Sequence, residues 1–299
     1  MMYLVSSSGH TTPSLPRRPC NQLSAWGGTV AAASLALLVQ SRAAHAANRR
    51  ETIAPSADDF RNLYPYTAPR DFLNYILQAV PSAGDPSAVQ DAMDAFSAVY
   101  PMYAVGRRKA AVLERVLRER ECKQCLEIGS FFGYSAISIA KTMGHDAELT
   151  CFEGNGENIE VMRGVLRHAF GNDGEVLGRI HIVEGLSTAS LMALAPNPAR
   201  PYDFVFLDHD KNCYLKDFTI LEEKGLLDAS SCTLVADNVI FPGAPDYLEY
   251  LGGAAAVSWD TRIEKLPFER IGFETQFKER QDGMSVSLRR RRSGGTLMS

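Results

Sequence analysis

Short apolar runs alternate with segments of helical periodicity through most of the chain. The apolar runs predict strands at residues 125–128, 149–153, 180–183, 203–207 and 233–236. Between them, apolar positions spaced three and four residues apart predict helices at about 135–142, 155–169, 187–194 and 215–224. This alternation is typical of a parallel sheet with helices on both faces. We therefore expect a doubly wound, Rossmann-like α/β fold whose ligands bind at the carboxyl ends of the strands.

Two more alternating segments, near residues 257–263 and 284–288, bring the expected sheet to seven strands. The second of them is expected to return antiparallel at the end of the sheet. Before the first strand, three amphipathic segments predict helices that cover the core, at 70–80, 86–96 and 107–120. Pro86 stands at the first position of its helix, where the missing N–H costs nothing.

The N-terminal fifty residues differ in composition from the rest. They contain arginines but no acid before Glu51, and their apolar stretch at 26–39 is short for a membrane span of ~20 residues. Ala44-His45-Ala46 resembles a small-residue cleavage site. A cleaved signal, a transit peptide and a short membrane anchor all fit this pattern, so the compartment stays open. Membrane association is expected only through this segment. The predicted divisions are a targeting or anchor segment at 1–50, a linker at 51–69, a folded domain at 70–290 and a tail at 291–299.

Composition narrows the class of protein. Hydrophobic residues make up 45% of the 299 positions, enough for a full core, and the net charge is −4. With an isoelectric point near 5.9, the chain is not expected to bind nucleic acid, and the basic run at 289–292 is interpreted as a solvated tail. The six cysteines are scattered and imply no disulfide. Cys122 and Cys125 have the spacing of a zinc or redox pair, but they lead directly into a buried strand and no second pair exists.

The segment 125–135, CLEIGSFFGYS, joins the first strand to a helix through a glycine-rich turn. Gly129 and Gly133 allow a sharp turn, and the helix that follows offers its N-terminal N–H groups to a ligand. The strand ends in Glu127, which would repel a pyrophosphate but attract a cation. S-adenosylmethionine carries a sulfonium and an ammonium group, so it suits this loop.

Polar side chains also end the other predicted strands. Glu153 closes the second strand, where an acid commonly holds the hydroxyls of a ribose. Asp208 follows the fourth strand, and Asp237 and Asn238 follow the fifth. Carboxylate and amide oxygens are the ligands that Mg²⁺ prefers, since it keeps several waters and takes one or two carboxylates. The sequence therefore predicts a magnesium site where these two strands end.

Four motifs follow one another along the chain: GDPSAV at 84–89, the glycine turn at 127–135, DHDKNCYL at 208–215 and ADNVIFPGAPD at 236–246. In sequence and in order they resemble the motifs of catechol O-methyltransferase. The resemblance covers about residues 70–288. It implies a class I, cation-dependent O-methyltransferase that uses S-adenosylmethionine and Mg²⁺.

The resemblance also implies a role for each matching residue. Lys211 would be the general base, and Lys211, Asn238 and Gln276 would contact the substrate. The Mg²⁺ ligands would be Asp208, Asp237 and Asn238. The cofactor would be bound by Val105, Glu127 and Ser135 at its methionine end, by Glu153 at the ribose, by Gly154, Ser187 and His209 at the adenine, and by Asp208 near the amino group. For His209, an ordinary packed histidine is the alternative.

The implied reaction follows from charge. A phenol has an ordinary pKa near ~10 and is a poor nucleophile at neutral pH. Two adjacent hydroxyls bound to Mg²⁺ are acidified and oriented, and a neutral Lys211 can accept the proton. Methyl transfer from a sulfonium to a phenolate gives neutral products, so fixed geometry matters more than further acid–base help.

The sequence departs from the family pattern around the substrate. Pro101 and Tyr103 replace a tryptophan and a methionine that line the catechol ring, and Asp210 replaces an aromatic residue. The acid that receives the second hydroxyl has no certain counterpart, because alignment reaches Gln276 or, with a two-residue gap, Glu274. These changes favour bulkier or more hydrophilic catechols.

Two other functions are compatible with the sequence. One is methylation of plant-type phenolics such as caffeoyl esters. The other is a binding or scaffold protein without turnover, although the intact positions 208, 211, 237 and 238 disfavour it. The partner is expected to be a small phenolic molecule, and the protein a monomer.

Overall fold

The computed structural model describes residues 56–171, 173–268 and 280–290. The predicted targeting segment and the tail at 291–299 therefore lie outside the described residues, as do Glu274 and Gln276. Within the described ranges, no helix is long and apolar enough to cross a membrane.

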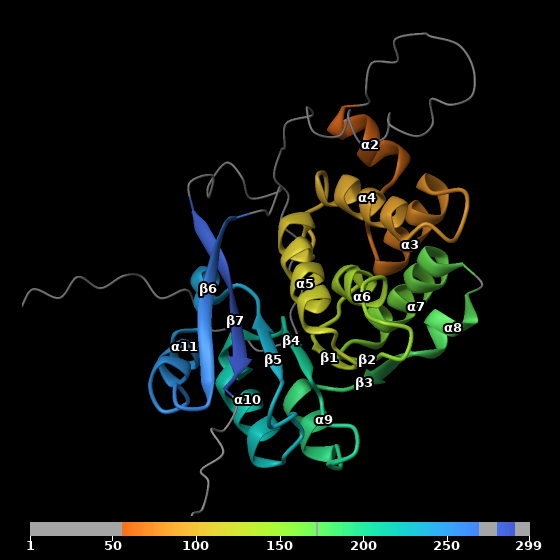
Figure 1. Ribbon diagram of the computed structural model, residues 1–299. Coiled ribbons are helices and arrows are strands. Elements are labelled where there is room, and N and C mark those ends of the chain that lie inside the picture. The colour runs from red at the N-terminus through yellow and green to blue at the C-terminus, as the bar shows by residue number, and fades with distance from the viewer. Residues whose placement is uncertain (1–55, 172, 269–279, 291–299) are drawn as a thin grey trace, which may run out of the picture.

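A single seven-stranded sheet forms the centre of the domain (Figure 1), with strand order β3-β2-β1-β4-β5-β7-β6. Strands β1 to β5 pair in parallel, while β7 runs antiparallel to β5 and to β6. The expected doubly wound α/β fold is confirmed. The strands are β1 Gln124–Ile128, β2 Glu148–Glu153, β3 Ile180–Glu184, β4 Phe204–Leu207, β5 Thr233–Ala236, β6 Trp259–Pro267 and β7 Gln281–Arg289.

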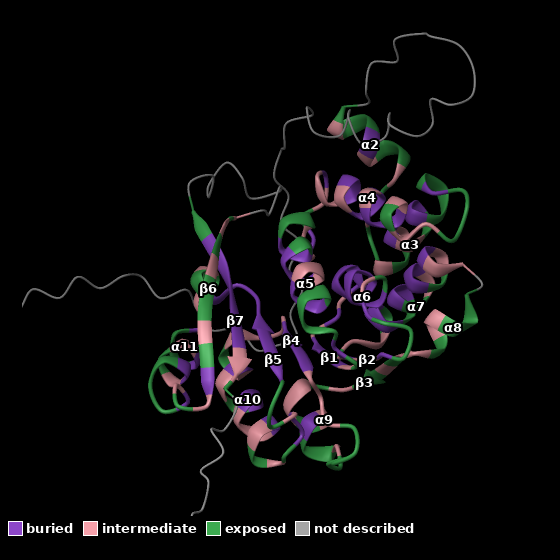
Figure 2. Cartoon of the chain, viewed as in Figure 1, coloured by how far each residue is buried: buried purple, intermediate pink, exposed green. Residues whose placement is uncertain are grey.

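One detail of the expected sheet was wrong. Strand β7 does return antiparallel, but it lies between β5 and β6 instead of at the end of the sheet. Its middle residues are buried, whereas the residues of β6 beyond the buried Trp259 are exposed or half-buried (Figure 2). The apolar and small residues of β7 can fill an interior position, while the charged residues of β6 suit an edge.

Helices cover both faces of the sheet, as the alternation in β4 requires. Phe204 and Phe206 point into the core beneath α5, α6 and α7, whereas Val205 and Leu207 point into the core beneath α9, α10 and α11. Because successive side chains of a strand face opposite ways, this strand is buried on both sides. The helices are α5 Arg107–Arg120, α6 Tyr134–Ala140, α7 Gly156–Phe170, α9 Ser187–Ala193, α10 Tyr214–Glu223 and α11 Pro245–Gly252. Three short helical segments join these elements, α8 Gly174–Gly178, η1 Lys211–Cys213 and η2 Val239–Gly243.

Three N-terminal helices form an outer layer beyond α6 and α7 (Figure 1). They are α2 Ala57–Leu63, α3 Pro69–Ala79 and α4 Pro86–Ser97. Helix α4 begins at Pro86 as predicted, with the Asp85 side chain accepting a hydrogen bond from the Ala88 N–H at 2.9 Å.

The linker expected at 51–69 is wrong over α2. Ser56 and Asp59 form a capping box that starts the helix. Phe60 is buried, and its ring lies 5.0 Å from that of Tyr64 and 5.2 Å from that of Tyr75. The segment 57–63 looks like a linker by its polar composition, but burial of the Phe60 ring holds it against the domain.

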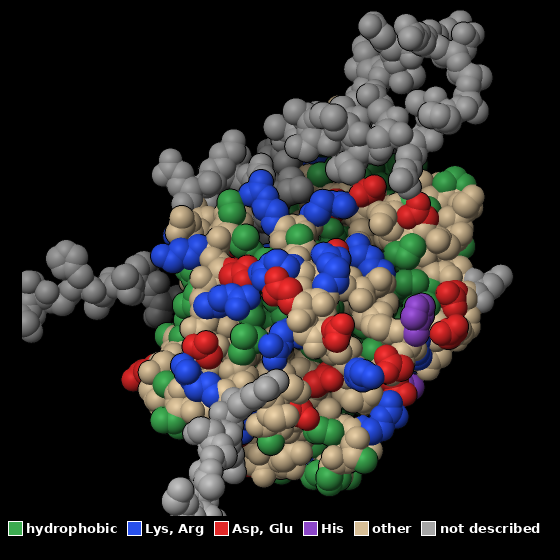
Figure 3. Space-filling model, in the orientation of Figure 1, with side chains coloured by type: hydrophobic (Ala, Val, Ile, Leu, Met, Phe, Trp, Pro, Cys, Tyr) green, Lys and Arg blue, Asp and Glu red, His purple; other side chains and the backbone are tan. Residues whose placement is uncertain are grey.

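The surface in Figure 3 carries basic and acidic side chains intermingled over the described residues. Inside, Cys122, Cys125, Cys151 and Cys232 are buried as free thiols. Burial raises the pKa of Cys122 to about 12, so this thiol is protonated at neutral pH and unsuited to redox work.

The glycine turn and the end of β4 approach each other closely. Gly129 has φ +92°, and a Cβ built there would lie 2.4 Å from the carbonyl oxygen of Asp208. Only a residue without a side chain allows this contact, which sets the turn directly against Asp208.

Gly129→Ala should therefore lower the free energy of unfolding by about 2–4 kcal/mol, through backbone strain and a steric clash. Gly225→Ala is the control, since Gly225 has φ +64° but open space around its Cβ position. That change should cost only about 1 kcal/mol. Urea unfolding measures both, and equal losses would contradict the predicted clash.

Candidate active site

The carboxyl ends of β4 and β5 bring the predicted metal ligands together. Leu207 pairs with Ala236, and the Asp237 N–H donates to the Leu207 carbonyl at 2.9 Å. Asp208 and Asp237 therefore follow adjoining strands on the same edge of the sheet. Their proximity is the geometry that the sequence predicted for these two residues.

Lys211, at the start of η1, lies beside them. Its Nζ donates to Asp208 Oδ1 at 2.9 Å and to the Tyr214 hydroxyl at 2.8 Å. The Tyr214 hydroxyl in turn lies 2.8 Å from the Leu207 carbonyl and 3.1 Å from the Asp237 carbonyl. Burial raises the pKa of Tyr214 well above its usual value, so its hydroxyl stays neutral and can donate its one hydrogen to either of these carbonyls.

Lys109 on α5 reaches the same edge, and nothing in the sequence analysis singled it out. Its Nζ lies 2.6 Å from Asp237 Oδ1 and 2.6 Å from Asp282 Oδ2 on β7. Burial would lower the pKa of Lys109, but these carboxylates raise it above its usual range. Burial raises the pKa of Asp237, an effect that Lys109 opposes. The sequence did contain a signal for Lys109, because this charged residue shares the apolar, buried face of α5 with Leu113 and Val116.

The donor set at this edge suits a hard cation. In the described part of the chain, no three or more histidine, cysteine, aspartate or glutamate side chains cluster in a way that could hold a metal ion. Asp208, Asp237 and Asn238 form a smaller set of two carboxylates and one amide. Mg²⁺ commonly keeps several waters and needs no more protein ligands than these, so the chemistry of the set fits it. Their role as ligands stays a prediction.

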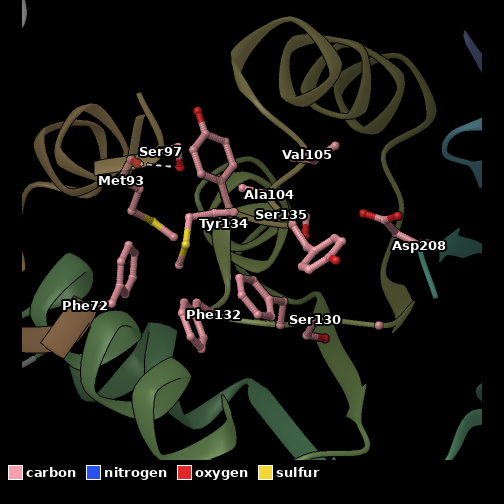
Figure 4. Close-up of a pocket in the computed structure, with 14 residues that line it drawn as sticks. Phe72, Met93, Ser97, Ala104, Val105, Ser130, Phe132, Tyr134, Ser135 and Asp208 are labelled. Carbon is pink, nitrogen blue, oxygen red and sulfur yellow. Dashed lines mark hydrogen bonds between the residues drawn. The ribbon is translucent and has the colours of Figure 1, made fainter. Parts of the chain in front are cut away.

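A pocket opens between the glycine turn, helices α3 and α4, and the loop before α5 (Figure 4). Val105 and Asp208 lie at one end, and Phe72 and Met93 lie at the other. Its lining residues include three that were predicted to bind the cofactor, Val105, Ser135 and Asp208.

Glu127, the acid at the end of β1, is completely buried next to the glycine turn. Its Oε1 has no hydrogen-bond partner among the described residues, and the same holds for the nearby Ser130 Oγ. Burial raises the pKa of Glu127 to about 7. An ammonium group would supply the missing donors and the missing positive charge. Ser130 was not predicted as a site residue.

Glu153 is oriented by three protein donors. Its Oε2 accepts from the Phe131 N–H at 2.8 Å, and its Oε1 accepts from the Asn155 N–H at 3.0 Å and from Asn158 Nδ2 at 3.1 Å. A carboxylate has about four acceptor positions, so a hydroxyl can still be accommodated. The carboxylate also links β2 to the glycine turn.

His209 is held in one orientation by a buried carboxylate. Its Nε2 lies 2.8 Å from Asp217 Oδ2, while Thr188 Oγ1 donates to Asp217 Oδ1 at 2.6 Å. Burial would raise the pKa of Asp217, but hydrogen bonds from His209, Ser187 and Thr188 hold it below its usual range. His209 Nδ1 is buried without a partner among the described residues. This geometry leaves one ring nitrogen available to a ligand.

The other predicted adenine contacts lie nearby in the fold. Ser187 begins α9 directly after β3, and Gly154 follows β2. A Cβ at Gly154 would lie 3.2 Å from the Leu186 side chain, in the loop that leads to Ser187. The two residues therefore belong to one side of the site.

The residues that depart from the family pattern have different surroundings. Tyr103 is 57% exposed, and its ring lies 6.2 Å from that of Phe131. Asp210 Oδ1 accepts from the Asn212 N–H at 3.0 Å and caps η1. Asp210 thus helps to start the turn that carries Lys211.

Comparisons with known proteins agree with this architecture. The sequence profile described as O-methyltransferase matches residues 88–246. Catechol O-methyltransferase of Bos taurus is 37% identical over 188 residues, which cover 60% of this chain and 65% of the bovine protein. The Sus scrofa catechol O-methyltransferase is 37% identical over 154 residues, which cover 50% of this chain and 77% of the relative. The matched region thus spans somewhat less than two thirds of the bovine enzyme's length.

Solved structures show the same fold at lower identity. An O-methyltransferase of Bacillus cereus in complex with SAH has a TM-score of 0.55 at 17% identity, covering 78% of this chain and 96% of that one. The O-methyltransferase TomG of Streptomyces achromogenes, in complex with SAM, has a TM-score of 0.55 at 20% identity, covering 77% and 94%.

The strand order and the glycine turn define a Rossmann-like α/β fold, which the chain shares with these two methyltransferase structures. Within this fold class, the chain belongs to the O-methyltransferase family, and its resemblance to catechol O-methyltransferase is confirmed.

The buried Glu127 predicts a specific pH dependence of stability. Its pKa is about 7 in the fold against an ordinary 4.5, so the folded state favours the protonated acid. The stabilisation is full below about pH 4.5 and is lost as the pH rises through 7. Glu127→Gln, which stays neutral, should make the cofactor-free protein more stable than the wild type at pH 8, by up to ~3 kcal/mol.

Thermal unfolding at pH 5 and pH 8 measures this effect. The gain should be present at pH 8 and close to absent at pH 5. A gain of equal size at both pH values would show that better packing, and not the charge of Glu127, is responsible.

Proposed function

We propose that this protein transfers a methyl group from S-adenosylmethionine to one hydroxyl of a catechol-type substrate in a Mg²⁺-dependent reaction. The observation that carries the proposal is the position of Asp208, Lys211, Asp237 and Asn238 at adjoining strand ends, next to a turn with a buried acid that has one oxygen without a partner among the described residues. The names of the mammalian relatives support the catechol-type substrate.

The cofactor would lie along the carboxyl ends of β1, β2 and β3. Glu127 Oε1 and Ser130 Oγ would take the ammonium group, beside Val105 and Ser135. Glu153 would accept the ribose hydroxyls. His209 Nδ1 would lie at the adenine, together with Gly154 and Ser187. The unpaired buried atoms support this placement, because each needs a partner that the described residues do not provide.

Asp208, Asp237 and Asn238 would hold the Mg²⁺ ion. Lys109 pairs with Asp237 and Asp282, and Lys211 pairs with Asp208, so this edge carries three carboxylates and two amino groups. With all of them ionised the net charge is −1, and with Lys211 neutral, as its role as a base requires, it is −2; both favour a divalent cation. Bound there, Mg²⁺ would acidify and orient two adjacent hydroxyls.

Lys211 would accept the proton of the reacting hydroxyl. In the structure its Nζ contacts Asp208 and Tyr214, so it is held beside the proposed ligands by short contacts. For the transfer, the sulfur–carbon bond breaks as the oxygen–carbon bond forms, and both charges disappear. The role of this chain is to hold the oxyanion in line with the methyl group in a dry site.

The residues at positions 103 and 210 favour a substrate site that is more open and more polar than the one the family pattern implies. Tyr103 is largely exposed at the pocket, and Asp210 stands in place of an aromatic residue. A bulky catechol, including a caffeoyl-type ester, could place its side chain along this edge. Substrate contacts by Asn238 and Gln276 belong to the same proposal.

Lys211→Met should lower kcat by roughly 10²–10⁴-fold while changing cofactor affinity less than threefold, because it removes the base and leaves the cofactor contacts. Lys216→Met is the control, since Lys216 is exposed on α10. Steady-state kinetics and titration with S-adenosylhomocysteine measure the two effects. Wild-type turnover in the Lys211 variant would remove the proposed base.

A substrate panel tests the reaction itself. The full chain with labelled S-adenosylmethionine should methylate catechols and caffeoyl esters, which have two adjacent hydroxyls, but not matched monophenols. Addition of EDTA should abolish product, and Mg²⁺ should restore it. Methylation of monophenols at the same rate, or turnover that persists in EDTA, would contradict the chelation of a diol. Cofactor binding without methylation of any acceptor would favour the scaffold function.

A further inference from the structure

Two buried charged residues behind the proposed metal ligands have so far entered the proposed function only through their charge. Lys109 on α5 is 5% exposed, and Asp282 on β7 is fully buried. Both contact the candidate ligands at Asp237 and Asn238. Burying a charged side chain costs free energy unless it is paired, so the partners of these two residues indicate what they do.

Asp282 fixes the orientation of the Asn238 amide. Its Oδ2 accepts from Asn238 Nδ2 at 2.6 Å and from Lys109 Nζ at 2.6 Å. Its Oδ1 accepts from the Phe241 N–H at 3.0 Å and from the Gly283 N–H at 2.7 Å. An ionised carboxylate only accepts hydrogen bonds, so the part of the Asn238 amide that faces it must be the NH₂ group. The amide oxygen therefore points the other way.

Lys109 has a comparable effect on Asp237. Its Nζ contacts Asp237 Oδ1, the same oxygen that accepts from the Asn238 N–H at 2.7 Å. Both donors therefore use one oxygen of the carboxylate. The contacts leave Oδ2 as the oxygen with which Asp237 can bind another ligand.

We propose that Lys109 and Asp282 are positioning residues that together select Mg²⁺ over Ca²⁺: Lys109 restricts Asp237 to one oxygen, and Asp282 fixes the direction of the single amide oxygen of Asn238. The inference rests on the proposed function, since it concerns the same ion. Mg²⁺ requires a near-ideal octahedron of single oxygens, whereas Ca²⁺ accepts six to eight ligands and bidentate carboxylates. An Asp237 that offers only one oxygen disfavours the larger ion.

The loss of charge and the loss of the restriction on Asp237 have different expected effects in Lys109→Met, which keeps most of the length of the side chain but removes its charge. Loss of a positive charge alone strengthens the binding of both divalent ions by a similar factor. Loss of the restriction on Asp237 favours Ca²⁺ over Mg²⁺. The ratio of the two affinities therefore isolates the positioning role.

The experiment is isothermal titration of the full chain, saturated with S-adenosylhomocysteine, with MgCl₂ and separately with CaCl₂. In Lys109→Met, the preference for Mg²⁺ over Ca²⁺ should fall by about tenfold or more. Asp282→Asn, which can present either amide atom to Asn238, should also reduce this preference and provides the test if the first variant does not fold. Arg118→Met is the control, because it removes an exposed charge from the same helix.

An equal change in both affinities in the folded variants would overturn the inference. Failure of the proposed function is distinguishable, since it appears in the wild-type titration as no binding of Mg²⁺. That result would overturn the proposed ion site and this inference together.

Discussion

The arrangement of the candidate active site at the carboxyl ends of β4 and β5 depends on one buried ammonium group, which lies between two carboxylates. Lys109 comes from α5, Asp237 follows β5 and Asp282 lies in β7, so this contact joins three elements that are distant in the sequence. Each charge would be costly to bury alone, and removal of one partner from such a cluster leaves an uncompensated charge. The network therefore fixes how α5 sits against the sheet, and with it the loop that contains Val105.

A second constraint operates on the other side of Asp208. There the backbone of Gly129 packs against the Asp208 carbonyl, which fixes the distance between the glycine turn and the end of β4. The proposed cofactor site and the proposed ion site share Asp208 as their boundary. Rigid strand ends can hold two reacting groups in line more accurately than mobile loops, which is the main requirement of a methyl transfer.

The buried polar atoms of the site differ in how many protein partners they have. Asp282 accepts four hydrogen bonds from protein donors, and Glu153 accepts three, which leaves it room for one more. Glu127 Oε1, Ser130 Oγ and His209 Nδ1 have none among the described residues. Buried polar atoms in folded proteins are normally paired, so these three, which lie at the carboxyl ends of the strands, agree with the cofactor position proposed above.

The sequence by itself determined the alternation of strands and helices, and with it the placing of Asp208 and Asp237. Parallel strands all end at one edge, so residues that follow adjoining strands meet without further information. The contact of Lys109 with Asp282, the burial of Phe60 and the insertion of β7 between β5 and β6 were decided only by the tertiary structure. They depend on which distant segments pack together, and local periodicity carries no record of that choice.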